Sequence, residues 1–268
     1  MRSLRKLVLA SALVFACSSP TASTPGVDAG KDVHKDAFVP PPDEDAGPTY
    51  RVSGNVLDTA AKPWSGAAVQ VCGTVCNVAF ADAAGAWTAD SISPEGKHLR
   101  VEGAPKDGRN WTPVVYHIEV NADLVVTTPT IVPETPTPIA LTAGSKVVNV
   151  GEVSITFDDA TLTGSTHVFS DVRVPKTIWP PYDAAGKTIV AMWGLIPFGA
   201  KSPTPMPVSL DASTLGLAAG DKVTLFSVDS DTGLLVEPVP ATVSSDGTRV
   251  VSDSGSGLLH LTWIVLAK

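Results

Sequence analysis

The sequence predicts an all-β protein with two β-sandwich domains, and three observations lead to this prediction. The chain has 268 residues with 22 Gly and 23 Pro, the residues that most often form turns, whereas only 17% of its residues are charged. Its apolar residues fall in many short, alternating runs, which is typical of strands. A break in composition at residue 133 divides this pattern into two parts, each long enough to bury a core.

The amino end has the features of a secretory signal. Arg2, Arg5 and Lys6 precede the apolar stretch 7–15, and this order of charged and apolar residues is typical of such signals. The stretch is too short to cross a bilayer as a helix, which takes about 20 residues. We therefore expect residues 1–16 to be a signal peptide that is removed during export.

The four residues that close this segment, VFAC, resemble the lipobox of bacterial lipoproteins, in which a peptidase cuts before the cysteine and the cysteine is then acylated. Val14 replaces the usual Leu and Phe15 the usual small residue, and an ordinary signal peptidase could also cut after Ala16. The resemblance implies that Cys17 is a lipidation site that anchors the chain to a membrane in the cell envelope. Because Ser18 is not the Asp that retains lipoproteins at the inner membrane, it implies the outer membrane in a Gram-negative cell.

Two further cysteines are expected to form a disulfide. The chain has three cysteines, and if Cys17 carries lipid, Cys72 and Cys76 are left as a pair. In VQVCGTVCNVAF they lie on either side of a three-residue turn between two alternating runs, close enough to bridge in an oxidising compartment. Two reduced, buried cysteines are the alternative. Metal binding is disfavoured because no second pair and no nearby His completes a set of four ligands.

Residues 17–49 are expected to be a disordered linker. The segment is rich in Pro, Ser, Thr and Asp and has hardly an apolar residue whose burial could offset the entropy of ordering it. Its prolines stiffen it, so it would hold the folded part of the chain away from a membrane surface.

From residue 50 to residue 132 strands alternate with turns, and we assign this region to a first β-sandwich. Small and polar residues separate its short apolar runs. The apolar residues that alternate along it are Val52, Val56, Ala67, Val69, Val71, Val78, Phe80, Trp87, Leu99 and Val101.

Part of this region, VSGNVLDTAAKPWSGAAVQVC and then ADAAGAWTADSISPEGKHLRVEG, resembles the carboxypeptidase regulatory-like domain. That family has a Val-x-Gly strand, a Pro-small-Gly-Ala turn and an Asp-x-x-Gly hairpin before an aromatic residue. Here these fall at residues 52–54, 63–67 and 82–85, with Trp87 as the aromatic, whereas Trp64 replaces the usual aliphatic residue. The resemblance implies a sandwich of transthyretin and starch-binding-like topology, a non-enzymatic module sometimes grouped with carbohydrate-binding-like folds.

Residues 133–145, PETPTPIALTAGS, are expected to form a semi-rigid linker because Pro alternates with Thr. Short apolar runs after it predict a second all-β domain over residues 146–268, most simply another sandwich. Its last third resembles the end of β-sandwich segments in bacterial surface and adhesion-type proteins, which implies a structural or interaction role. The runs are 146–150, 153–157, 168–174, 188–196, 207–210, 222–228, 234–236, 248–251 and 258–266.

Charge and spacing exclude several functions. The net charge is −8 and no Lys/Arg cluster follows the amino end, so we expect no nucleic-acid partner. The five His are scattered without zinc-site spacing, and we expect no cofactor and no metal. Asp229 and Asp231 begin like a calcium loop but lack the later oxygen ligands. We interpret them as turn formers and keep an ion site as the alternative.

The segment SDSGSG at residues 252–257, with His260 close behind, invites comparison with serine proteases. The flanking residues of those motifs are missing, so we interpret it as a polar loop in which Gly255 and Gly257 supply a positive φ. Neither paired carboxylates nor a nucleophile with its base can be picked out elsewhere. We therefore expect that the chain is not an enzyme.

Aromatic residues are the remaining candidates for a binding site. In TIWPPYDAAG, Trp179 and Tyr182 flank two prolines in an expected loop, where they could stack on a sugar or hold a protein partner. The alternative is that they cover the core, where Trp193 and Trp263 are expected. We thus predict a surface binding module for carbohydrate or an envelope protein. The alternative is a structural spacer or accessory subunit with no small-molecule ligand.

Overall fold

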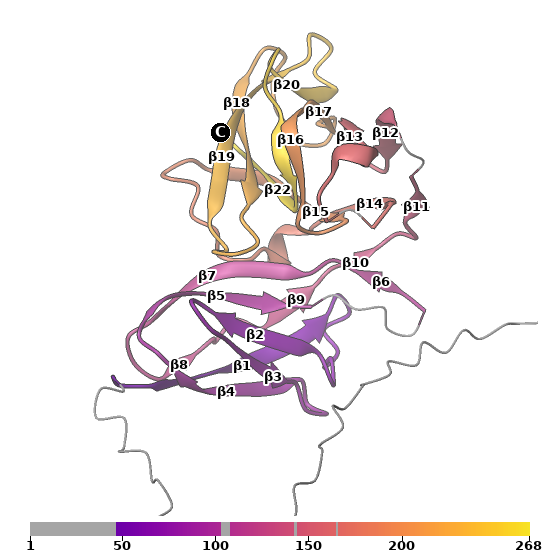
Figure 1. Ribbon diagram of the computed structural model, residues 1–268. Helices are drawn as coiled ribbons and strands as arrows, with labels where there is room; N and C mark the ends of the chain where they lie inside the picture. Colours follow the sequence, from indigo (N-terminus) through magenta and orange to yellow (C-terminus); the bar gives the residue numbers. More distant parts are fainter. Residues whose placement is uncertain (1–46, 103–107, 142–143, 165) are drawn as a thin grey trace, which may run out of the picture. The chain divides into compact units, whose positions relative to one another are not determined.

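The computed structural model describes residues 47–102, 108–141, 144–164 and 166–268 (Figure 1). Within these ranges the chain is all-β, as predicted, and its helical structure consists of two single-turn 3₁₀ helices, η1 (Asp159–Thr161) and η2 (Lys176–Ile178). Among the described residues no helix has the length and apolar character to cross a membrane. The predicted signal peptide, Cys17 and most of the predicted disordered linker lie outside the described residues.

The first part of the chain forms two small sheets. One has the order β4–β1–β8, and a further strand, β9, also pairs with β1. These strands are β1 (Tyr50–Asp58), β4 (Ala86–Ile92), β8 (Leu124–Val125) and β9 (Thr130–Val132). The other sheet has the order β3–β2–β5–β7. Its strands are β2 (Ala68–Cys72), β3 (Cys76–Phe80), β5 (Glu95–Val101) and β7 (Val114–Val120).

The alternation of the sequence explains which residues these sheets bury. Val52 and Val56 of β1 are fully buried, and Trp87 of β4 packs over Gly54 between them, because a Cβ on that glycine would lie 3.0 Å from the indole. Trp64, which departs from the family pattern, is buried against Trp111, with ring centroids 4.7 Å apart. The larger residue at position 64 thus fills space beside a second tryptophan.

The hairpin of β2 and β3 contains the predicted disulfide. Cys72 and Cys76 are cross-strand partners, and their sulfur atoms are joined in the structure. The Gly-Thr-Val turn lies between them, as expected. The disulfide therefore fixes the register of the edge strand β3 at the end next to the turn.

Residues 133–141, at the start of the expected linker, include two short strands. β10 (Glu134–Thr135) pairs with β6 (Asn110–Trp111), and β11 (Ile139–Ala140) pairs with β14 (Val168–Arg173). The segment thus hydrogen-bonds to the strands on both sides of it in the chain. The predicted domain boundaries themselves stay a prediction.

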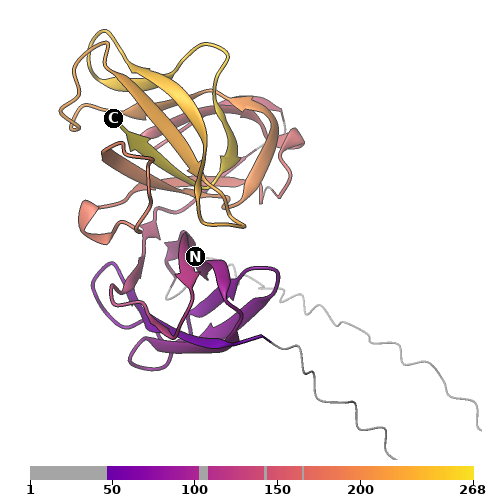
Figure 2. The same cartoon turned by 90° about the vertical axis from the view of Figure 1, so that its left-hand side faces the viewer.

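The second sandwich is built on one continuous path of ten strands, and these curl round a common core (Figure 2). β12 and β14, near opposite ends of the path, contact each other, and β22 lies between β15 and β18. Trp193 and Trp263 are fully buried, as predicted. The order is β11–β14–β15–β22–β18–β19–β20–β17–β13–β12, with β12 (Ser145–Val150), β13 (Val153–Asp158), β15 (Ile189–Ile196), β17 (Val208–Asp211), β18 (Lys222–Val228), β19 (Leu235–Val243), β20 (Arg249–Ser252) and β22 (Trp263–Ala267).

One strand of this region was not predicted. β16 (Ala200–Met206) pairs with β21 (Leu258–Leu261) although it contains Pro203 and Pro205. The pairing is irregular between Lys201 and Met206, so the prolines fall where the register shifts and no ladder hydrogen bond is needed from them.

The SDSGSG loop before β21 corrects one detail of the prediction. Gly255 has a positive φ of 77°, as expected, but Gly257 does not. A Cβ at Gly257 would lie 2.3 Å from the carbonyl oxygen of Met206. That position therefore needs glycine because a neighbouring backbone approaches closely and not because of its own φ.

The outer edge of β7 is covered by residues of the second sandwich. The Trp263 Nε1–H donates to the oxygen of Pro113 (2.7 Å), the Tyr182 hydroxyl to the oxygen of Val115 (2.6 Å), and the His117 N–H to the oxygen of Gly233 (3.2 Å). Residues 113, 115 and 117 alternate along the strand, so their polar groups lie on one edge. A hydrophobic core cluster also includes residues of both parts.

Candidate functional site

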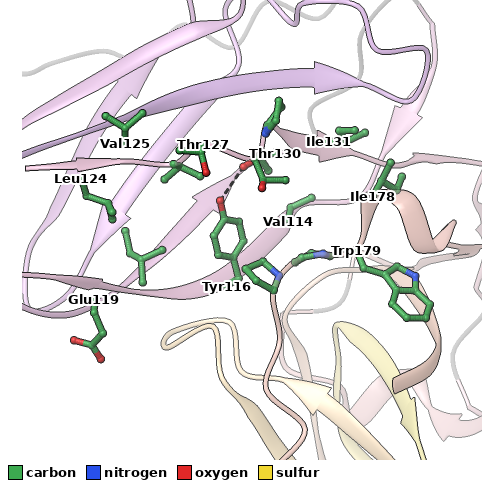
Figure 3. Close-up of a pocket in the computed structure, with 16 residues that line it drawn as sticks. Val114, Tyr116, Glu119, Leu124, Val125, Thr127, Thr130, Ile131, Ile178 and Trp179 are labelled. Atoms are coloured by element: carbon green, nitrogen blue, oxygen red, sulfur yellow. Dashed lines mark hydrogen bonds between the residues drawn. The ribbon is translucent and has the colours of Figure 1, made fainter. Parts of the chain in front are cut away.

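A groove of about 430 Å³ opens beside the inner face of β7 (Figure 3). We call it the Trp179 groove. Its walls come from three segments that are far apart in the sequence: β7, the stretch from β8 to β9, and the loop after η2. Its lining residues are Val114, Tyr116, Ile118, Glu119, the residues 124–131, and Ile178, Trp179, Pro180 and Pro181.

The β7 side of the groove is apolar and held in place by one hydrogen bond. Val114, Tyr116 and Ile118 alternate along the strand and are buried. The Tyr116 hydroxyl lies 2.9 Å from Thr130 Oγ1, a bond that connects β7 to β9 (Figure 3). Burial raises the pKa of Tyr116, so its hydroxyl stays protonated at neutral pH.

The opposite wall, residues 124–131, was missed as part of a site. Its sequence LVVTTPTI places exposed Val125 and the hydroxyls of Thr127 and Thr128 along the groove. Alternation predicts strands in this stretch, and the structure has two there, β8 and β9. Nothing local in the sequence signals that this stretch faces a loop about fifty residues later, since the contact is tertiary.

Trp179 is placed at one end of the groove, as a candidate binding residue would be. Figure 3 shows it beside Ile178, at the far end from Leu124 and Glu119. The side chain is half-buried, and its Nε1–H donates to the Val174 oxygen at 2.8 Å, which fixes the ring. A fixed, partly exposed indole is suited to contact the apolar face of a ligand.

Tyr182, predicted together with Trp179, lies elsewhere. It is not among the residues that line the groove. Its hydroxyl donates to Val115, its ring packs edge-on against Trp263 with centroids 6.2 Å apart, and burial raises its pKa well above the ordinary value. The structure therefore places the two aromatic residues in different surroundings: Trp179 lines a groove, and Tyr182 joins β7 to the second sandwich.

Trp179 also borders a second, shallower space of about 310 Å³, which we call the cationic hollow. Its polar side is formed by Arg173 and Lys176. The Lys176 Nζ lies 5.7 Å from the centroid of the Trp179 ring, a distance at which an ammonium interacts favourably with an indole. The other lining residues are Val174, Pro175, Val190 and Ala191.

Asp229 acts as the turn former that its sequence suggests. Its Oδ1 accepts hydrogen bonds from the backbone N–H groups of Asp231 and Thr232 and from the Thr232 hydroxyl, at 2.8 to 3.0 Å. These bonds use one of the two oxygens of the Asp229 carboxylate to hold the turn. In the part of the chain that the structure describes, no group of three or more His, Cys, Asp or Glu side chains is arranged to hold a metal.

The SDSGSG segment has no catalytic geometry. The Ser256 hydroxyl donates to the backbone oxygen of Asp253 at 2.6 Å, and His260 Nδ1 lies 3.0 Å from Glu237. The hydroxyl and the imidazole thus have different partners. In the Trp179 groove the one ionisable carboxyl is that of Glu119, whose Oε1 lies 2.8 Å from His117 Nε2. These residues can bind and orient a ligand, but they do not pair a nucleophile with a base.

Comparison with known proteins identifies no family for this chain. No family model and no curated protein matches the chain. Similar solved structures include a putative carbohydrate binding protein from Bacteroides uniformis, with 12% identity over 82% of this chain and 79% of that one and a TM-score of 0.25. They also include the major pilin SpaD of Corynebacterium diphtheriae, with 12% identity over 82% and 56% and a TM-score of 0.29, and the major pilin subunit BcpA of Bacillus cereus, with 10% identity over 82% and 95% and a TM-score of 0.28. At these TM-scores the similarities support no argument about function.

Proposed function

We propose that this chain is a non-enzymatic binding module of the cell envelope that holds a polysaccharide or an envelope protein in the Trp179 groove. The observation that carries the proposal is the groove itself, with a fixed tryptophan at one end. It is concave, mostly apolar, and lined by a few hydroxyl groups, which is the usual make-up of a ligand site.

Of these two ligand classes, a polysaccharide or an envelope protein, we favour the polysaccharide. The threonine hydroxyls of residues 127 and 128 are exposed donors and acceptors, and Trp179 offers an aromatic surface. A sugar ring has apolar C–H groups on its faces and hydroxyls around its rim, so it needs both kinds of contact. A protein partner remains the second ligand class of the proposal.

The location in the envelope is part of the proposal and is supported by the sequence. The charged and apolar order of residues 1–16 and the lipobox-like VFAC argue for export and acylation at Cys17. Three acyl chains would make membrane attachment effectively permanent, at about 0.8 kcal/mol per buried CH₂. Mass spectrometry of the mature amino end tests this point. An unacylated Cys17 in a soluble fraction would contradict it.

One observation favours a second candidate, a structural spacer. Tyr182, Trp263 and Gly233 occupy three backbone positions along the edge of β7, which gives the two sandwiches a bonded, partly buried interface. A protein that only had to separate other components would need this rigidity and no ligand.

The test is a binding titration of the full-length chain, purified in detergent, against a panel of soluble polysaccharides, measured by calorimetry. Binding at the groove predicts that Trp179→Ala weakens affinity at least tenfold, the order expected for removal of a central aromatic contact. Val125→Ala, at the other end of the same groove, serves as the matched control and should lower affinity much less. Far-UV circular dichroism confirms that both variants fold.

Two outcomes contradict the polysaccharide proposal. One is the absence of binding to every polysaccharide. The other is binding that Trp179→Ala leaves unchanged, which would place the ligand elsewhere. The first shifts support to the spacer or to a protein partner, and crosslinking on intact cells distinguishes these.

A further inference from the structure

The charges on either side of Trp179 differ. On the groove side the one ionisable carboxyl is Glu119, which lies at the end far from Trp179 (Figure 3). On the hollow side the charged lining residues are Arg173 and Lys176, and no carboxylate lines that space. The chain has a net charge of −8, so a space lined by two cations beside the half-buried Trp179 is opposite in sign to the chain as a whole.

The two cations are not equally neutralised. The Arg173 Nη1 lies 3.7 Å from Glu152 Oε2 and donates to Thr214 Oγ1 at 2.6 Å. Glu152 is itself shared, since its Oε2 accepts from the Trp193 indole at 2.9 Å. Asp211 also interacts electrostatically with Arg173. Two carboxylates therefore balance the Arg173 guanidinium, and Lys176 is the less neutralised of the two cations.

Lys176 is exposed, and its recorded interaction is with the face of Trp179. Within the described residues no carboxylate oxygen lies within 4.0 Å of its Nζ. The same holds for Lys62 and Lys187, whereas Lys97, Lys201, Lys222 and Lys268 each have such a partner. An ammonium next to an arginine, with no acid to balance it, attracts an external anion.

We propose that the ligand of the Trp179 site is an anionic polysaccharide, whose carboxylate or sulfate group enters the cationic hollow while a neutral ring contacts Trp179. This inference rests on the proposed function and specifies its substrate class. An anion there can accept from the Lys176 ammonium and from the Arg173 guanidinium, both charge-assisted bonds. Val174, Pro175, Val190 and Ala191 supply an apolar surface beneath them.

The contact with the two cations and the contact with Trp179 lead to different predictions, because they involve different parts of the ligand. The ring contact at Trp179 needs no charge and is insensitive to salt. The contact at Lys176 and Arg173 weakens as salt rises, since exposed charges are screened. Affinity for an acidic polysaccharide should therefore fall with salt to a plateau set by the ring contact, whereas affinity for a neutral one should not change.

The experiment compares three probes with the full-length chain in detergent: polygalacturonate, which carries carboxylates, chondroitin sulfate, which carries sulfates as well, and neutral dextran. The test variant is Lys176→Gln. The matched control is Lys187→Gln, which removes the same charge from another exposed lysine that does not line the hollow. We expect Lys176→Gln to weaken binding of an acidic probe about tenfold, as for a lost hydrogen bond between charged groups, and Lys187→Gln less than about twofold.

The outcomes separate this inference from the function on which it rests. Tighter binding of either acidic probe than of dextran, with loss in Lys176→Gln alone, supports it, and the acidic probe that binds better identifies the anion. Equal binding of acidic and neutral probes that still depends on Trp179 overturns the inference and leaves the proposed function in place. Equal losses in the two lysine variants would assign the effect to net charge and overturn it too. No binding of any probe overturns both.

Discussion

The two edges of the sheet β3–β2–β5–β7 differ in what lies beside them. At β7 the outward polar groups of Pro113, Val115 and His117 are bonded to residues of the second sandwich. At β3 the exposed side chains are apolar and uncharged: Val78 is 54% and Phe80 68% exposed. Both edges belong to one sheet, yet the described residues of the second sandwich bond to the backbone of one edge only.

The difference shows what the second sandwich does for the first. An edge strand offers unpaired N–H and C=O groups that invite pairing with another chain, and proteins cover, charge or bend such edges. The β7 edge is covered by three residues spread over about eighty positions of the chain. The β3 edge is held by its disulfide and by Asn77, whose side-chain amide donates to the backbone oxygen of Asp90 in β4 at 2.7 Å. The second sandwich is thus a structural partner of the first as well as a neighbour in sequence.

The largest expected effect is at Gly233, whose backbone lies close to that of Tyr116 and His117 in β7. Its φ is +69°, and a Cβ there would lie 2.4 Å from the backbone carbon of Tyr116. Gly233→Ala should lower the free energy of unfolding by about 3 kcal/mol or more, because steric overlap adds to the strain of a positive φ. Denaturant unfolding followed by tryptophan fluorescence measures it.

Gly247→Ala is the control, since Gly247 also has a positive φ of 73° but no atom within 4 Å of the added Cβ. It should cost about 1 kcal/mol, from φ strain alone. If the two variants lost the same stability, the close approach at β7 would not matter to the fold.

Tyr182→Phe comes next, because it removes one of the three edge bonds and keeps the ring. The Val115 oxygen is left without its donor, so we expect a loss of about 1 to 2 kcal/mol in the same unfolding assay. Tyr50→Phe is the comparison, since no hydrogen bond of its hydroxyl is recorded in the described part of the chain. A Tyr182→Phe variant as stable as the Tyr50→Phe variant would mean that water replaces the lost bond.

A smaller effect should follow pH. His98 of β5 is paired across the sheet with His117 and buried, and burial lowers its pKa below the ordinary 6.5, although Asp231 and Asp229 act in the other direction and Arg100 and His117 add to the lowering. Below pH 6.5 the unfolded chain therefore binds a proton that the folded chain resists. Stability should fall as pH drops through 6.5 toward the lowered pKa, and remain constant above it.

His98→Gln cannot titrate, so the pH dependence of unfolding between pH 7.5 and 5.5 should be shallower in this variant. An unchanged slope would assign the dependence to other groups.

The smallest expected effect on stability is at the uncovered edge. Phe80→Ser replaces an exposed ring and should change the free energy of unfolding by no more than about 0.5 kcal/mol. It should reduce self-association at high concentration, measured by light scattering, because the apolar face of β3 is made polar. Unchanged self-association in this variant would show that the exposed ring of Phe80 does not cause association between copies of the chain.

Much of this fold could be predicted because its strands alternate clearly. The expected runs at 153–157 and 222–228 correspond closely to β13 and β18, since polar and apolar residues there follow the two faces of a sheet. β16 was missed because Pro203 and Pro205 argue against a strand, and only the irregular pairing with β21 accommodates them.

The candidate site was predictable only in part. Trp179 could be selected because an aromatic residue beside two prolines stands out in a loop. Tyr182, three residues later, has the same local signal, but its bond to Val115 spans 67 positions. The groove wall at 124–131 and the cationic hollow depend on contacts of the same long range. A single sequence carries no local trace of them, so it could not distinguish a residue that lines a groove from one that closes an interface.

The position of β22 has a consequence for how the chain reaches this state. β22 lies between β15 and β18, so each of these strands lacks one of its two partners until residues 263–267 are available. A ribosome or a translocation channel delivers the chain in order from its amino end, and until those residues arrive the second sandwich is open at its centre. The ten-stranded sheet therefore closes only after all of its other strands have been synthesised.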